Sequence, residues 1–351
     1  MRLTWTVPCS AVASLLLAAL AVAPPAAAEN TSGEDAPAAF TLEDPRIVES
    51  SGLQASHRHP GVYWTHNDSD YPPEIYAVDS GTGETVATVT LQGVEFRDVE
   101  GIHLGPEGDL YVGDIGDNFD GAWPHVWIYR FAEPAELADV TLTPTVYTVQ
   151  YDDGPRDAEA LMVHPDTGRV YLASKKRDGS GAVYSGPEEL TPGGAVNVFA
   201  RLYDTDLWVT GGAFSPDGTR LLLRGYFAAE MFRWEDGIPE PLGMVTVPMQ
   251  RQGESVTFTP DGRTLMFGSE GERSAVQPVP LEGELLPESA QDGNGDGPGA
   301  GGDGADGRES GEGDGAAEGD EGTLRLVLLF ALGTVLVVAL RRLFRKHDRN
   351  R

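Results

Sequence analysis

Hydrophobic and polar positions follow one pattern five times along this chain. A polar or acidic residue opens a short apolar run, a turn containing Pro, Gly or Asp follows, and a second apolar run ends on polar residues. Repeats of roughly 40–60 residues that are built from strands predict stacked blades of a β-propeller. The five copies span residues 49–68, 98–114, 157–176, 209–224 and 253–270.

Two further apolar segments follow most copies. They alternate with a period of two and are bounded by Gly, Pro and Asp, which is typical of strands. Four strands per copy is the number found in propeller blades. The fold class is therefore predicted to be an all-β propeller with five blades, and six blades is the alternative because the copies are unevenly spaced. The added strands are predicted at 74–79, 85–91, 126–131, 145–151, 182–185, 196–202, 230–234 and 243–247.

The fifth copy is followed by one short segment, 275–281, whose prolines suit an edge strand. We expect residues 39–42 to supply the missing outer strand of that blade. Pairing the two ends of the domain in one blade removes the open edge of the ring. The propeller domain is predicted to span 29–287.

Both ends of the chain carry membrane signals. Arg2, an apolar stretch at 12–22 and a run of alanines at 26–28 predict a secretory signal peptide over 1–28. The apolar segment 326–340 is flanked by arginines and predicts a transmembrane helix over 324–342. The basic tail at 343–351 is then cytoplasmic, because positive charge favours that side.

The segment 288–323 consists almost entirely of Gly, Asp, Glu and Ala. It cannot bury enough apolar surface to fold, so we predict a disordered stalk that holds the domain outside the cell. The net charge of −30 and the pI near 4.4 argue against nucleic acid as a partner. The sequence therefore predicts a single-pass protein of the cell membrane with an extracellular N-terminal domain.

In a propeller, the start of the first strand and the end of the second strand of each blade share one face. Applied to every copy, this rule gathers a rim of carboxylates with a few cations. Oxygen ligands on short loops suit Ca²⁺, although turns also favour Asp and Asn for backbone reasons alone. The candidate metal ligands are Asp98, Glu100, Asp114, Asp157, Glu159 and Glu254.

Catalysis by this rim would need one carboxylate to activate water and another group to protonate the leaving atom. Glu100, Glu159 and Glu254 are the candidates for these roles. The chain has no G-x-S-x-G, H-E-x-x-H, P-loop or C-x-x-C motif, so spacing does not select a reaction. The candidate ligand-binding residues are Lys175, Arg224, Asn67 and His66.

Two D-x-E motifs, Asp98-Val-Glu100 and Asp157-Ala-Glu159, precede turns and apolar strands, and F-x-P-D-G occurs at 214–218 and 258–262. With these motifs the chain resembles secreted bacterial propellers of the WD40/NHL-like kind, and phytase-like propellers are the nearest group. That resemblance implies Ca²⁺ and a phosphate-ester substrate. The four D-x-E carboxylates match, whereas copies one, four and five lack the pair.

Three functions remain open from the sequence. The first is a ligand-binding or interaction module that uses the acidic rim, with a bound cation, to recognise a small ligand, a glycan or an extracellular protein. The second is a Ca²⁺-dependent hydrolase of a phosphate ester, lactone or glycan. The third is a structural propeller whose blade sides bind a protein partner through aromatic residues such as Trp123 and Trp127.

Overall fold

The computed structural model describes residues 37–119, 121–176 and 180–291. Within these ranges, apart from one short 3-10 turn, η1 (Gly283–Leu285), and one helical turn, α1 (Glu288–Gln291), the regular structure is β-strand. The predicted signal peptide, the transmembrane helix, the basic tail and all but the first residues of the predicted stalk lie outside the described residues. In the part that is described, no helix is long and apolar enough to span a membrane.

The strands of the described residues form five antiparallel units, each with four strands in which the first lies innermost. The first unit contains β2 (Ser50–Ala55), β3 (Val62–Asn67), β4 (Glu74–Asp79) and β5 (Thr85–Leu91). The second contains β6 (Val99–Leu104), β7 (Asp109–Asp114), β8 (Val126–Ala132) and β10 (Thr145–Tyr151). The third contains β11 (Ala158–Val163), β12 (Val170–Ser174), β13 (Gly181–Ser185) and β14 (Val196–Thr205). The fourth contains β15 (Val209–Phe214), β16 (Arg220–Gly225), β17 (Ala229–Glu235) and β18 (Ile238–Val245). The fifth contains β19 (Gly253–Phe258), β20 (Thr264–Ser269), β21 (Ala275–Pro280) and β1 (Phe40–Thr41).

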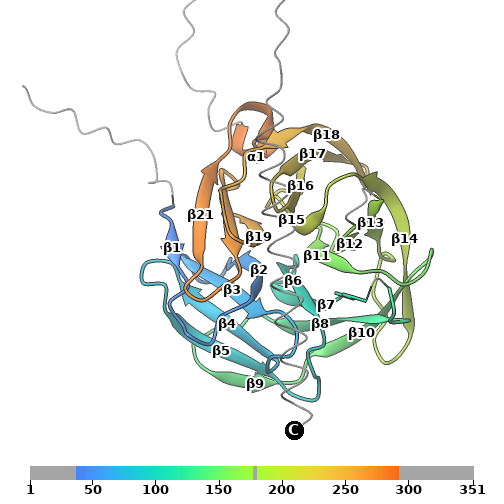
Figure 1. The fold of residues 1–351 in the computed structure, drawn as a ribbon, viewed down its shortest axis with the longest axis horizontal. Coiled ribbons are helices and arrows are strands. Elements are labelled where there is room, and N and C mark those ends of the chain that lie inside the picture. The colour runs from blue at the N-terminus through green and yellow to red at the C-terminus, as the bar shows by residue number, and fades with distance from the viewer. Residues whose placement is uncertain (1–36, 120, 177–179, 292–351) are drawn as a thin grey trace, which may run out of the picture. The chain divides into compact units, whose positions relative to one another are not determined.

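The five innermost strands contact one another in a closed order, β2–β6–β11–β15–β19 and back to β2 (Figure 1). Four of these strands are buried along their whole length, because each faces the channel and both neighbouring units. A cluster of buried apolar side chains fills each junction between adjacent units; Trp64, Tyr129 and Leu110 belong to the one between the first two. This arrangement is propeller-like, as the sequence pattern predicted.

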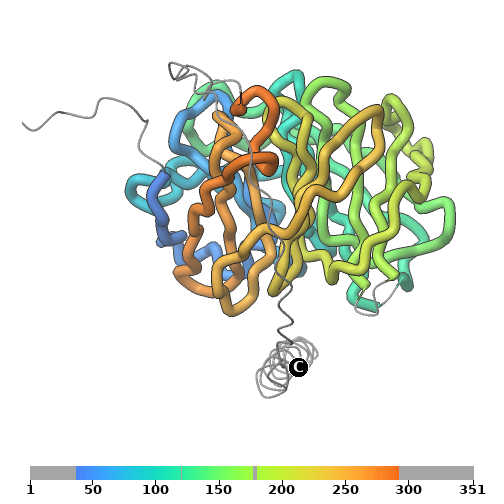
Figure 2. The backbone as a smooth tube through the Cα atoms, turned by 90° about the horizontal axis from the view of Figure 1, so that it is seen from above, coloured from blue at the N-terminus to red at the C-terminus, as the bar shows by residue number. Residues whose placement is uncertain are grey.

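The two ends of the domain meet in one unit, which confirms the prediction for residues 39–42. Strand β1 pairs antiparallel with β21, so Phe40 lies opposite Val276. Figure 2 shows the blue N-terminal segment next to the orange C-terminal strands. The chain therefore closes the ring with hydrogen bonds between its first and last strands.

Two pairings at the outer edge were not predicted. A short strand, β9 (Val140–Leu142), leaves the second unit and pairs parallel with β5 of the first. Strand β10 pairs parallel with β14, so the outer edges of the second and third units join in one sheet. These contacts cover three outer edges that would otherwise expose unpaired backbone groups.

Tight Pro-Asp-Gly turns join the first and second strands of the fourth and fifth units. Gly218 and Gly262 both have a φ of +70°, a left-handed conformation that favours glycine. The amide of Gly218 donates to the carbonyl oxygen of Ser215 at 2.9 Å. Such hairpins return the second strand to the point where the first began, so both contribute residues to one face, which we call the site face.

Candidate acidic centre

A β-bulge interrupts the pairing of the first and second strands at the same position in every unit. In each case one residue of the inner strand is skipped in the register. A bulge bends the strand and redirects the side chain of the extra residue. The skipped residues are Ser51, Glu100, Glu159, Thr210 and Glu254. Three of the five are the carboxylates that the sequence offered as catalytic candidates.

A second set of residues follows the last residue of the second strand. The backbone amides of Asp68, Lys175 and Glu270 donate to carbonyl oxygens just before the inner strands of their own units. Tyr226 has the same register position in the fourth unit, directly after Gly225. Bulge residues, these strand-end residues and two residues that directly precede inner strands, Asp98 and Gln252, together form the acidic centre on the site face. Its members outside the bulges are Asp68, Asp98, Lys175, Tyr226, Gln252 and Glu270.

Three carboxylates from two units come together at one side of the centre. Single oxygen atoms of Asp68, Asp98 and Glu100 all lie within 4.8 Å of one another. Their exposed fractions are 2%, 2% and 5%. We call this group the carboxylate corner. Buried oxygen donors at this spacing are the ligands that Ca²⁺ prefers.

The loop after β7 covers the carboxylate corner. The Asn118 side-chain amide donates to Asp98 Oδ2 at 2.9 Å and to Oδ1 at 3.2 Å. Gly116 packs so closely that an added Cβ would lie 2.8 Å from Asp98 Cγ and 2.9 Å from Glu100 Cγ. Any larger residue at 116 would therefore displace the carboxylates.

Lys175 defines the opposite side of the centre. Its Nζ lies 2.8 Å from Glu159 Oε1, and 18% of the lysine side chain is exposed. The Tyr226 hydroxyl donates to Glu254 Oε1 at 2.9 Å, whereas Glu254 Oε2 is buried without a hydrogen-bond partner in the described part of the chain. We call Glu159, Lys175, Tyr226 and Glu254 the lysine corner.

Ser51 and Glu270 extend the polar contacts of the carboxylate corner into the fifth unit. The Ser51 hydroxyl lies 3.0 Å from Glu100 Oε2 and 3.4 Å from Glu270 Oε1. The Gln252 side-chain amide donates to the other oxygen of Glu270. Side chains from the first, second and fifth units are thus joined by hydrogen bonds on the site face.

Burial raises the pKa of the carboxyl groups in this cluster. For Glu100 the pKa lies well above its ordinary value because of burial, with Asp68, Glu159 and Asp98 adding to the effect. Burial and neighbouring carboxylates likewise raise the pKa of Glu270. Burial also raises the pKa values of Glu159 and Glu254 against the opposing charge of Lys175. A cluster of this kind must take up protons or a cation.

Two predicted ligand-binding residues use their side chains inside the fold. The Asn67 side-chain oxygen accepts the amides of Val48 and Glu49, both at 2.9 Å. Arg224 is fully buried and donates to the carbonyl oxygens of Ser255 and Gly268 at 2.8 and 3.0 Å. Both side chains therefore bind backbone groups within the fold, and neither belongs to the acidic centre.

Three other candidates also make contacts with the protein itself. Asp114 accepts the amide of Asp98 at 2.8 Å and the Tyr129 hydroxyl at 2.9 Å. Asp157 accepts the amide of Asp117 at 2.8 Å. His66 is fully buried, which lowers its pKa to about 4, so its ring is neutral. None of the three belongs to the group of carboxylates within 4.8 Å of one another.

Ser51, Tyr226 and Gln252 were not identified from the sequence. Their signal lies in the register: Tyr226 follows its strand as Lys175 and Glu270 follow theirs, and Ser51 occupies the position of Glu100. In each of these units the strand-end residue follows the partner of the residue just before the bulge. In the fourth unit this rule selects Tyr226 in place of Arg224.

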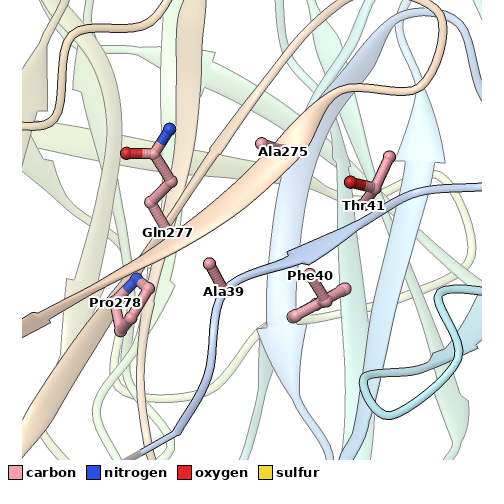
Figure 3. Close-up of a pocket in the computed structure, with 6 residues that line it drawn as sticks. All are labelled: Ala39, Phe40, Thr41, Ala275, Gln277 and Pro278. Carbon is pink, nitrogen blue, oxygen red and sulfur yellow. The ribbon is translucent and has the colours of Figure 1, made fainter.

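The channel beneath the bulge residues is narrow. Its lining includes Ser51, Glu100, Glu159 and Glu254, and it has room for about one water molecule. A larger hollow of about 270 Å³ lies between β1 and β21 at the outer edge (Figure 3). The six residues that line it include no charged side chain, so this hollow has no acid, base or carboxylate ligand of the kind found in the acidic centre.

Comparisons with known proteins give no family. No protein-family model and no curated protein matches the chain. Among solved structures, it is similar to a protein from Bacteroides uniformis described as a 6-phosphogluconolactonase, with 14% identity over 68% of this chain and 69% of the other, at a TM-score of 0.39.

Two further solved structures show the same low similarity. A luciferin-regenerating enzyme has 15% identity over 67% of this chain and 78% of its own, at a TM-score of 0.41. An auxiliary nutrient binding protein from Bacteroides thetaiotaomicron has 12% identity over 68% of this chain, at a TM-score of 0.39, and the match spans 59% of that protein. Superpositions this loose assign neither fold nor activity, so the propeller-like description rests on the strand pairing.

Proposed function

We propose that the acidic centre binds a divalent cation, Ca²⁺, and that a five-bladed propeller uses this cation to bind a ligand at the cell surface. The observation that supports it is the carboxylate corner, where Asp68, Asp98 and Glu100 bring buried oxygens within 4.8 Å of one another. Each antiparallel unit then corresponds to one blade. The predicted signal peptide and transmembrane helix would place the domain outside the cell.

The charge balance of the centre favours a cation at this corner. Among the described residues assigned to the centre, the positively charged one is Lys175, and it lies against Glu159 in the other corner. Glu100 has a raised pKa because burial and neighbouring carboxylates disfavour its ionised form. A bound Ca²⁺ would replace protons there, and hard oxygen ligands select it over softer metals.

A thermal-unfolding experiment tests the cation site. The full-length protein is treated with EDTA, dialysed, and melted with and without 1–2 mM Ca²⁺ (roughly the free concentration outside cells, where sites of 10⁻⁴–10⁻³ M affinity operate). We expect Ca²⁺ to raise Tm by several degrees, since a ligand that binds only the folded state stabilises it. The Glu100→Gln variant should lose most of this shift.

The matched control removes one carboxylate far from the centre. Asp204 pairs with Arg201 on an exposed part of β14, and Asp204→Asn should keep the full Ca²⁺ shift. Equal shifts in Glu100→Gln and Asp204→Asn would exclude the carboxylate corner as the site. No shift in the unmodified protein would exclude the cation site itself.

The lysine corner supports a second candidate function, a Ca²⁺-dependent hydrolase. Glu159 beside Lys175, and Glu254 beside the Tyr226 hydroxyl, are groups able to give or take a proton near a bound cation. Turnover of aryl phosphates, lactones or aryl glycosides that EDTA abolishes and Ca²⁺ restores would favour this function over binding alone.

A further inference from the structure

The hairpins that join the first and second strands of each unit lie at the end opposite the site face. In every unit, the residue that opens the hairpin donates its amide to a carbonyl oxygen at or beside the start of the second strand, at 2.8 or 2.9 Å. This bond identifies equivalent positions, which are occupied by Ser56, Gly105, His164, Ser215 and Thr259. Of these five residues, His164 is the one whose side chain titrates near neutral pH.

In the fourth and fifth units, a hydroxyl group at this position organises the hairpin. Ser215 Oγ accepts the amide of Arg220 at 3.0 Å, and Thr259 Oγ1 accepts the amide of Thr264 at 3.1 Å. Both hydroxyls also donate to the aspartate two positions further on. Serine and threonine hydroxyls do not ionise at ordinary pH. These two hairpins therefore keep their bonds to the backbone in acid.

In the third unit, an imidazole takes the place of the hydroxyl. His164 Nδ1 accepts the amides of Asp166 and Thr167 at 3.3 and 3.4 Å. Such an acceptor requires the neutral ring, because both nitrogens of a protonated ring are donors.

The same ring packs against the hairpin of the fourth unit. The side chain of His164 is 8% exposed, and its ring meets that of Phe214 edge to face, with centres 5.1 Å apart. An added Cβ at Gly218 would lie 2.7 Å from His164 Cε1 and 2.8 Å from Nε2. One neutral side chain thus organises its own hairpin and fills the contact with the next one.

Burial disfavours the protonated form of this ring. It lowers the pKa of His164 below the ordinary value of 6.5, although Asp166 in its own turn and Asp217 in the next one act in the opposite direction. His103 of the second unit interacts with the same ring, and its own pKa is lowered to about 4. Arg169, the cation of the same hairpin, donates to a backbone carbonyl oxygen at 2.8 Å. The contribution of the neutral ring to stability is therefore complete above pH 6.5 and is lost as the pH falls below that value.

We propose that His164 is an acid-sensitive latch between the third and fourth units. A proton added to Nδ1 turns that nitrogen from an acceptor into a donor that faces two amide groups, and the two hairpins separate. Their separation opens the buried cluster of aromatic rings at this junction, which contains Tyr171, Phe214 and Trp234. Acid thus loosens one joint of the ring of units, and the latch does not depend on the proposed cation site.

Hydrogen exchange of the full-length protein, in detergent and EDTA, tests the latch hairpin by hairpin. Exchange rates at pH 8 and pH 5, corrected for the intrinsic rate at each pH, measure how often each segment opens. We expect opening of residues 164–168 and 215–219 to increase about fivefold more towards pH 5 than opening of residues 259–263. His164→Ser should remove this difference, because Ser215 already serves the equivalent position in the fourth unit.

A matched control replaces another hairpin histidine. His59 lies in the hairpin of the first unit, where its Nε2 is 2.8 Å from the carbonyl oxygen of Pro134. His59→Ser should keep the full acid response of the third and fourth hairpins. Because both variants are compared with the unmodified protein, the titration of other carboxyl and imidazole groups cancels.

Two results would overturn the proposal. One is an equal acid response of the third and fourth hairpins in the unmodified protein and in His164→Ser. The other comes from NMR of the imidazole carbons, in which the His164 signal is the one that His164→Ser removes. A ring that takes up its proton at or above pH 6.5 in the folded protein would show that the fold does not favour the neutral form. This second measurement is made on the unmodified protein, so it stands even if the serine variant unfolds.

Discussion

In the lysine corner, the buried carboxylates Glu159 and Glu254 lie close to Lys175 and Tyr226. In the carboxylate corner, Asp68, Asp98 and Glu100 lie close to one another instead. The two corners occupy one face and use equivalent bulge and strand-end positions of different units. They differ because Lys175 and Asp68 follow the second strand at the same register position. One residue type at that position thus decides whether a unit contributes a positive or a negative charge to the centre.

Removal of the internal cation should have the largest effect. We expect Lys175→Met to lower the free energy of unfolding by about 3 kcal/mol at pH 7.5, because it leaves Glu159 buried without its ionic partner. Urea unfolding in EDTA measures this loss. Arg273→Met, which removes an exposed ion pair with Glu43, should cost less than about 1 kcal/mol. Similar losses in both variants would show that the buried pair contributes no more than a surface pair.

The pH dependence of stability tests the buried carboxyl groups of the acidic centre. Glu100, Glu159, Glu254 and Glu270 have folded-state pKa values above their ordinary value near 4.5. Above that pH the folded state binds more protons than the unfolded state, so the free energy of unfolding falls as pH rises through the raised pKa values. We expect Glu100 to contribute a loss of about 2 kcal/mol between pH 5 and pH 8 in EDTA, measured as the difference between the pH profiles of the unmodified protein and the Glu100→Gln variant.

Burial lowers the pKa values of His66 and His103 to about 4, so these two groups make the free energy of unfolding rise with pH, and the comparison of the two proteins cancels their effect. The Asp44 and Asp217 pKa values are lowered to about 2, so their stabilising contribution is complete above pH 5. Lys175 has a raised pKa and stays charged across the same range. Saturating Ca²⁺ should reduce the pH dependence, since the cation replaces protons in the carboxylate corner. Parallel pH profiles of the unmodified protein and Glu100→Gln in EDTA would contradict the prediction.

The repeat in the sequence predicted most of the fold because inner strands and turns carry local signals. Alternating apolar runs and Pro-Asp-Gly turns do not depend on distant partners. The strand β9 has three residues and pairs parallel with a strand about 50 positions away, so no local pattern marks it. Strand β18 begins at Ile238 rather than at the predicted 243, because its prolines are tolerated on an edge strand.

The residues of the acidic centre were predicted from their charge, without knowledge of how the strands pair. Glu100, Glu159, Glu254 and Lys175 lie where the propeller rule places them. Arg224 was selected for its charge, yet its side chain turns into the junction with the fifth unit and reaches two backbone carbonyls. The direction of a side chain at a bulge depends on how neighbouring strands pair, and one sequence does not record that pairing.

The smallest effect should come from Tyr226, which contributes one hydrogen bond to the lysine corner. We expect Tyr226→Phe to cost about 1 kcal/mol, because Glu254 loses the hydroxyl that lies 2.9 Å from its Oε1. Tyr184→Phe removes a similar bond to Asp153 outside the two corners and is the matched control. Only the Tyr226 variant should steepen the loss of stability between pH 5 and pH 8, since its hydroxyl favours ionised Glu254, whereas the pKa of Asp153 is lowered and Asp153 stays ionised across this range. If both variants left the pH profile unchanged, Tyr226 would act in packing alone, and the lysine corner would depend on Lys175 for its charge balance.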